Sequence, residues 1–176
     1  KGIYIPGSRM KELDNYLELA KKTDINAFVI DVKDDEGYIT FPSQNQKLLQ
    51  MGSVKENPSI KNISQAMVRM YEEDIYPIAR IVVFKDSVVG EKFSDRLIQD
   101  INGNPYRTPR ENQVWLNPYD KRNWEYISEI AKEAARLGFK EIQLDYVRFH
   151  ESMNSERVQL DPNQSKAEII TEFITY

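Results

Sequence analysis

Four short runs of apolar, β-branched and aromatic residues recur along the chain, and each is followed by a longer stretch with helical spacing. The runs cover residues 2–6, 27–33, 76–85 and 141–149. Strands that alternate with helices form parallel sheets, and such strands read as continuous apolar runs because both faces of the sheet are covered. The alternation therefore predicts an α/β fold built from four parallel (β/α) units.

Apolar residues recur at helical spacing in three of the intervals, starting from Leu13, from Ile63 and from Trp124. The third pattern stops at Gly138, a residue type that commonly ends helices. A last pattern covers residues 165–176. These patterns predict four helices between and after the strands.

The connections between these elements differ in length. Helix-to-strand connections are short, at residues 22–26 and 137–140, whereas strand-to-helix connections are long, at residues 34–58, 86–120 and 150–163. The long connections all follow strands, so they gather at the carboxyl edge of a parallel sheet. Parallel α/β folds place their binding and catalytic groups at that edge, and we expect the functional site of this chain there.

The amino-acid composition excludes several classes of function for this chain. The chain has 176 residues without a repeat or linker, which predicts one structural unit over residues 1–176. The absence of cysteine excludes thiol chemistry, iron–sulfur clusters and zinc ribbons. A single histidine, His150, leaves a metal site short of ligands, so we expect no metal and no cofactor. A net charge of -4 without a concentrated Lys/Arg face argues against nucleic-acid binding.

Three of the predicted strands carry an ionisable residue among apolar neighbours: Asp31, Arg80 and Asp145. Burying such a group without a partner is costly, so each must be paired or must face a polar cavity. Two interpretations are open: an internal ion pair of Arg80 with an aspartate, or a charged cluster that forms a site at the strand ends. Side chains two residues apart share one face of a strand. Asp31 with Lys33, and Gln143 with Asp145, would then point into that site.

Five segments carry a family resemblance: KGIYIPG, NAFVIDVKDDEGYITF, YPIARIVVFKD, WLNPYDKRNWEY and GFKEIQLDYVRFH. In this order and spacing they resemble the bacterial family known as the putative glycoside-hydrolase domain, a relative of the α-amylase-like and other (β/α)8 hydrolases. The resemblance implies a TIM-type barrel in which Asp145 lies at the catalytic face. There it would serve as nucleophile or as stabiliser of an oxocarbenium-like transition state.

A complete barrel takes roughly 200 residues or more, whereas this chain supplies four strands. We therefore expect about half of a (β/α)8 barrel, either as a fragment or as a chain that self-associates to cover its open sheet edges. The resemblance implies hydrolysis of O-glycosyl bonds by the full barrel, and we expect the isolated 176 residues to be inactive.

Glycoside hydrolysis needs a second carboxyl group beside the first. Asp31 is our candidate for it, either as a supporting acid or as the ion-pair partner of Arg80. The acidic residues 34–36 follow on a loop closed by Gly37. We interpret them as a solvated turn, with a Ca2+ site as the alternative.

Sugars are bound by flat aromatic rings and by polar side chains that hydrogen-bond their hydroxyl groups. Trp115 lies in a loop, which favours a sugar platform as much as ordinary packing, and His150 is either a substrate contact or a solvated side chain. The candidates for substrate binding are Tyr4, Lys33, Arg80, Trp115, Asn117, Tyr119, Gln143, Arg148 and His150.

The sequence thus predicts a bacterial glycoside hydrolase that acts on a polysaccharide, outside the cell or in the cell envelope. The main alternative is a noncatalytic carbohydrate-binding or cell-envelope module of the same fold, which would bind sugar without turnover. A nucleotide-binding fold and a serine hydrolase are disfavoured because no GxGxxG, GxxxxGK[ST] or GxSxG motif is present.

Overall fold

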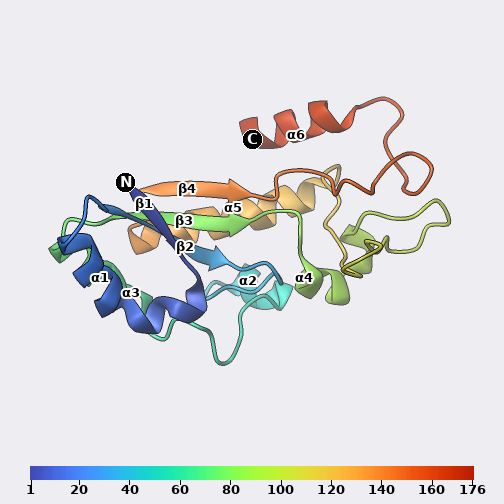
Figure 1. Cartoon of the computed structure of the whole chain (residues 1–176). Coiled ribbons are helices and arrows are strands. Elements are labelled where there is room, and N and C mark those ends of the chain that lie inside the picture. The colour runs from blue at the N-terminus through green and yellow to red at the C-terminus, as the bar shows by residue number, and fades with distance from the viewer.

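Four parallel strands form the sheet of the computed structural model, which describes residues 1–176 (Figure 1). Their order in the sheet is their order in the chain: β1 (Gly2–Ile5), β2 (Ala27–Lys33), β3 (Tyr76–Val82) and β4 (Glu141–Asp145). Each crossover therefore leads to the adjacent strand, as in a TIM-type barrel. All four predicted strands are confirmed: β2 has the predicted bounds, β1 ends one residue early, and β3 and β4 are shorter by three and four residues.

The strand β4 ends early because the backbone changes conformation directly after it. Tyr146 has φ 53, which lies outside the extended region, so the chain leaves the sheet after Asp145. Asp145 is paired in register with Val82, the last residue of β3. Both strands therefore stop at the same level of the sheet, and the side chains that follow them belong to loops.

The four predicted helices are confirmed as α1 (Leu13–Lys21), α3 (Ile63–Glu72), α5 (Lys121–Leu137) and α6 (Lys166–Thr175). As predicted, α5 stops at Gly138, which adopts the left-handed φ of 101. Further short helices were not predicted: η1 (Gly7–Glu12) between β1 and α1, and, within the long connections, α2 (Gln46–Met51), α4 (Ser87–Lys92) and η2 (Ser94–Arg96). Each has six residues or fewer, too few to display a helical period.

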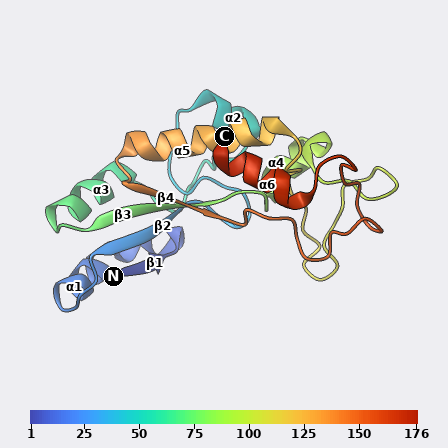
Figure 2. The same cartoon turned by 90° about the horizontal axis from the view of Figure 1, so that it is seen from above.

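The two faces of the sheet differ in burial. Phe28, Ile30, Ala79 and Ile81 alternate along β2 and β3 toward the helices and are completely buried. On the opposite face, Val29 and Ile78 are only partly buried, and the buried residues that follow them, Asp31 and Arg80, are charged. Figure 2 shows α3 and α5 running along the sheet beside β3 and β4, and α1 beside β1. The helices thus cover one face, and the other face is the open interior side of a partial barrel.

The sheet ends at β1 on one side and at β4 on the other. Near these edges, Tyr4 is 50% exposed and Leu144 is 38% exposed. The last helix, α6, packs through Phe173, whose ring centroid lies 5.0 Å from that of Phe84 and 5.8 Å from that of Trp124. No helix has the length and apolar character needed to cross a membrane.

A fully buried ion pair joins the end of β2 to the loop after β3. The Lys33 Nζ lies 3.0 Å from the Asp86 Oδ2, and both side chains are completely buried. Lys33 also donates to the carbonyl oxygens of Val82, at 2.7 Å, and of Lys85, at 3.3 Å. Asp86 accepts the Val89 N–H at the start of α4. Burial raises the pKa of Asp86, although Lys33 opposes the shift.

Replacing Asp86 should therefore destabilise the fold. Asp86→Ala leaves the Lys33 ammonium buried without its counter-ion, and breaking a buried pair in this way costs about 3–5 kcal/mol. Urea denaturation measures the loss. The matched control is Asp24→Ala, which breaks the exposed pair between Asp24 and Lys1 and should change the free energy of unfolding little. Equal losses in the two variants would contradict the importance of the buried pair.

Candidate functional site

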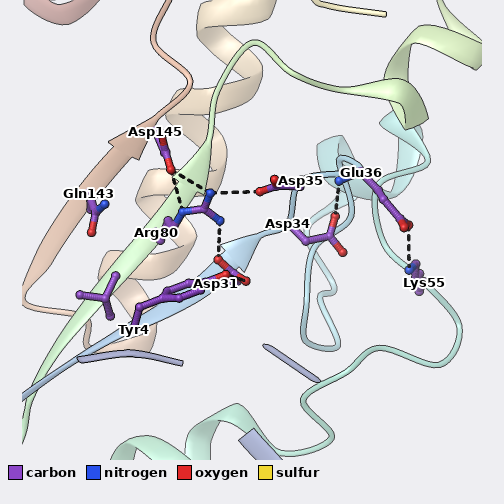
Figure 3. Close-up of a pocket in the computed structure, with 10 residues that line it drawn as sticks. Tyr4, Asp31, Asp34, Asp35, Glu36, Lys55, Arg80, Gln143 and Asp145 are labelled. Carbon is purple, nitrogen blue, oxygen red and sulfur yellow. Dashed lines mark hydrogen bonds and ion pairs between the residues drawn. The ribbon is translucent and has the colours of Figure 1, made fainter. Parts of the chain in front are cut away.

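One guanidinium lies at the centre of the site. Arg80, on β3, donates from Nη1 to the Asp31 Oδ1 at 2.7 Å, from Nε to the Asp145 Oδ2 at 2.9 Å and from Nη2 to the Asp35 Oδ1 at 3.0 Å. Its Nη2 also lies 2.8 Å from the Asp145 Oδ2. Figure 3 shows the three carboxylates pointing toward Arg80 from different sides. The arginine thus pairs with three carboxylates at once.

The register of the sheet explains why these residues meet. Asp31 on β2 is paired with Arg80 on β3, and Arg80 with Gln143 on β4. Asp145 lies two residues beyond Gln143 and so shares its face of the strand. Asp35 comes from the loop after β2 and reaches Arg80 from the carboxyl end of the sheet (Figure 3).

Further donors hold the carboxylates around the arginine. The Tyr4 hydroxyl donates to the Asp31 Oδ2 at 2.7 Å. Asp35 also receives the Lys85 Nζ at 3.3 Å and the Tyr146 hydroxyl at 3.2 Å. The Tyr146 N–H donates to the Asp145 Oδ1 at 2.7 Å. Asp31 and Asp35 therefore have a donor on each of their oxygens.

The charges of the cluster shift the pKa values of its members. Burial raises the pKa of Tyr4, and the acceptor Asp31 raises it further. Burial would lower the pKa of Arg80, but the hydrogen bonds to Asp31 and Asp145 outweigh it, and the pKa is raised. Burial would raise the pKa of Asp35, but Arg80 and Lys85 outweigh it, and the pKa is lowered. Arg80 and Asp35 therefore favour the paired, charged state.

A cavity of about 640 Å³ opens above this cluster. The side chains that line it come from the open face of the sheet and from the loop after β2 (Figure 3). They are Tyr4, Val29, Asp31, Asp34, Asp35, Glu36, Lys55, Arg80, Gln143 and Asp145. Within the cavity, Asp35 and Asp145 are the exposed carboxylates of the cluster, with 45% and 40% of their side chains accessible, against 7% for Asp31.

The loop after β2 forms a turn that the sequence predicted only in part. Asp34 accepts the N–H groups of Glu36, Gly37 and Tyr38, and Gly37 adopts φ 114. The prediction of a solvated turn does not hold for the Asp35 side chain, because this side chain pairs with Arg80. No group of three or more potential ligands in the structure is arranged to hold a metal ion.

Sequence reasoning placed Asp35 outside the site because its loop position gave no register. The signal that could have found it is the number of donors on Arg80. A guanidinium has five N–H donors, so pairing with Asp31 and Asp145 leaves a donor for a further carboxylate from the loop.

Five of the residues predicted for the site lie together. Asp145, Asp31 and Arg80 form the cluster, and Tyr4 and Gln143 line the same cavity.

Lys33, predicted to contact substrate, lies in the buried pair with Asp86 instead. The register between β2 and β3 shifts between Asp31 and Lys33, so the simple alternation that would align the two side chains is interrupted. The Lys33 ammonium consequently turns into the core beneath the loops.

Trp115, predicted to be a sugar platform or a packing residue, is 2% exposed. Its ring packs edge-on against Tyr146, at 5.7 Å between centroids, and against His150, at 5.5 Å. The Arg148 guanidinium lies 5.2 Å from the Trp115 ring centroid. The structure therefore places Trp115 in the core behind the site, and its ring faces are not open to a ligand.

The remaining predicted contacts lie outside the cavity. Asn117 accepts the Tyr119 N–H, and the Tyr119 hydroxyl donates to the Gln164 carbonyl at 3.0 Å. His150 is bonded through Nδ1 to the Ser152 hydroxyl at 2.8 Å. These side chains organise the loops that follow β3 and β4.

The fold and the site together define a class of protein: a partial TIM-type barrel with carboxylates gathered around an arginine at the carboxyl ends of its strands. The chain belongs to the family described as "Putative glycosyl hydrolase domain", whose model matches residues 2–176. This confirms the resemblance seen in the sequence. Among curated proteins no match was found.

Solved structures show the same fold. A hypothetical protein from Ruminiclostridium thermocellum is 35% identical, with a TM-score of 0.89 over 99% of this chain and 90% of that chain. The α-galactosidase TtGalA from Thermus thermophilus is 16% identical, with a TM-score of 0.60 over 84% of this chain and 30% of that chain. The maltogenic α-amylase AmyB from Thermotoga neapolitana is 16% identical, with a TM-score of 0.60 over 82% of this chain and 38% of that chain. The chain thus spans about a third of the length of these two enzymes, and the likeness to them shows the fold alone.

The lowered pKa of Asp35 predicts a pH-dependent contribution to stability. A carboxyl whose folded-state pKa lies below its unfolded value, about 3.9 for aspartate, stabilises the fold above that value and loses this effect as pH falls through the folded-state pKa. Asp35→Asn should therefore be less stable than the wild type at neutral pH, and the gap should close in acid.

Urea denaturation over a series of pH values measures this gap. The control Glu125→Gln, an exposed position on α5 without an ion-pair partner, should show no comparable change. A gap that widens on acidification would contradict the pairing of Asp35 with Arg80.

Proposed function

We propose that this chain carries the catalytic carboxylate of a glycoside hydrolase that acts on a polysaccharide, and that this carboxylate is Asp145. The observation that carries the proposal is the position of Asp145 at the carboxyl end of β4. There its side chain is 40% exposed to the cavity and hydrogen-bonded to Arg80. Membership of a glycosyl hydrolase domain family supports the reaction class.

The chemistry follows from an ionised carboxylate beside an open cavity. When a glycosidic bond breaks, positive charge develops at the anomeric carbon and the ring oxygen, and a nearby carboxylate stabilises that charge or attacks the carbon. Arg80 holds the Asp145 carboxylate in place through the hydrogen bond from Nε and the close contact of Nη2. In this proposal Asp145 acts on the sugar and Arg80 holds it.

Asp31 serves in this proposal as the partner of Arg80. Its Oδ1 accepts from Arg80 and its Oδ2 accepts from the Tyr4 hydroxyl, and the side chain is 7% exposed. A general acid must carry a proton and reach the leaving oxygen. Asp31 is almost buried and already accepts a hydrogen bond on each oxygen, so it is poorly placed to carry a proton to the leaving oxygen.

The substrate contacts come from the rest of the cavity wall. Tyr4, at 50% exposure, offers an aromatic surface beside the cluster, and Gln143 offers an exposed amide. Asp34 and Lys55 line the side formed by the loop after β2. Planar and charged groups of this kind hydrogen-bond sugar hydroxyls, while rings stack on the C–H faces of sugars.

A second candidate function is sugar binding without turnover. The observation that favours it is the engagement of all three carboxylates of the cluster, each of which accepts a hydrogen bond on both oxygens. Hydrolysis requires a second carboxyl group that can carry a proton. A chain with a complete binding surface and an incomplete acid–base pair would act as a carbohydrate-binding module.

Release of reducing sugar from a panel of bacterial and plant polysaccharides tests the proposal. A protein that contains this chain within a full barrel should release sugar, and Asp145→Asn in the same protein should lower the rate by roughly 100-fold or more, because it removes the carboxylate charge from the transition state. Glu125→Gln, on the outer surface of α5, serves as the control and should retain activity.

Calorimetric titration with the same glycans separates the two candidate functions. Binding without turnover by both the wild type and Asp145→Asn would establish the binding module and overturn the hydrolase. Turnover that survives in Asp145→Asn would show that a different group performs the chemistry.

A further inference from the structure

We propose that Tyr146 is the positioning residue of this site, and that it orients both Asp145 and Asp35 around Arg80. The inference rests on the proposed function of Asp145. It concerns a residue that neither lines the cavity nor was predicted from the sequence.

The backbone of Tyr146 supplies the first contact. Its φ of 53 is left-handed, and its N–H donates to the Asp145 Oδ1 at 2.7 Å. The other two non-glycine residues with positive φ are Asp74 and Asn112, of the types that adopt this conformation most readily. A tyrosine in this conformation is uncommon, and such strained residues concentrate at functional sites.

The two oxygens of Asp145 are consequently held from two directions. The Oδ2 accepts from Arg80, and the Oδ1 accepts from the Tyr146 N–H. Together these contacts limit rotation of the carboxylate about its terminal torsion angle. A carboxylate that must meet a reacting carbon gains from being held in one orientation before the substrate arrives.

The side chain of Tyr146 supplies the second contact. Its hydroxyl donates to the Asp35 Oδ2 at 3.2 Å, and Asp35 in turn receives Arg80 on its other oxygen. The Tyr146 ring packs edge-on against the buried Trp115, and the Lys85 Nζ lies 5.0 Å from its centroid. These contacts fix the ring, and the fixed ring gives the hydroxyl a defined position.

Tyr146→Phe tests the role of the hydroxyl while keeping the ring and its packing. The variant should fold as the wild type does, and its carboxyl carbon-13 NMR titration should show Asp35 ionising at higher pH, because the ionised form loses a donor. The other charged groups that face Asp35, Arg80 and Lys85, are unchanged. The Asp35→Asn spectrum assigns the signal.

The kinetic readout uses a polysaccharide that the wild type hydrolyses. Tyr146→Phe should lower kcat by about 10-fold with little change in KM, because Asp35 loses a donor and the Arg80 guanidinium that it shares with Asp145 is held less firmly. Tyr146→Gly, which adopts positive φ without strain and keeps the N–H, should retain the Asp145 contact but shift the Asp35 titration as Tyr146→Phe does.

The matched control is Tyr106→Phe, which removes a hydroxyl that donates to the Ser152 Oγ at 3.0 Å, away from the cavity. It should leave the Asp35 titration and kcat unchanged. An unmoved Asp35 titration in Tyr146→Phe, or equal effects of Tyr146→Phe and Tyr106→Phe, would overturn the positioning role. Absence of hydrolysis by the wild type would instead count against the proposed function, and the NMR titration would still decide the role of Tyr146.

Discussion

The site depends on the pairing of one guanidinium with three carboxylates. Asp31, Asp35 and Asp145 come from two strands and a loop, and Arg80 contacts each of them at 3.0 Å or less. Carboxylates placed this close together would repel one another without a cation between them. Arg80 therefore allows negative charge to accumulate at the carboxyl edge of the sheet and ties the loop after β2 to that edge.

An internal ion pair and a functional cluster looked like alternative interpretations of the strand charges, yet the same residues satisfy both. The cluster has a buried side and an open side. Asp31 is 7% exposed and accepts hydrogen bonds from Arg80 and Tyr4, whereas Asp35 and Asp145 are 45% and 40% exposed at the cavity. Within one network, the inner carboxylate supplies structure and the two outer carboxylates face the cavity.

The buried pair of Lys33 and Asp86 supports this edge from beneath. It links the last residue of β2 to the first turn of α4, so the two loops that carry Asp35 and Lys85 start from a common anchor. A buried ion pair adds little net stability compared with apolar packing. Any conformation that separates its partners is nevertheless unfavourable, because it leaves a buried charge without its counter-ion. The loops are therefore restricted to geometries that bring Asp35 toward Arg80.

Local patterns in the sequence predicted the four strands, the four principal helices and the strand positions of Asp31, Arg80 and Asp145, because strand and helix periods are local properties. The other features follow from the tertiary structure. Lys33 left the predicted face at a register shift, Trp115 entered the core, and Asp35 and Tyr146 joined the site from loops. Each of these outcomes depends on contacts between segments distant in the chain, which no local pattern records.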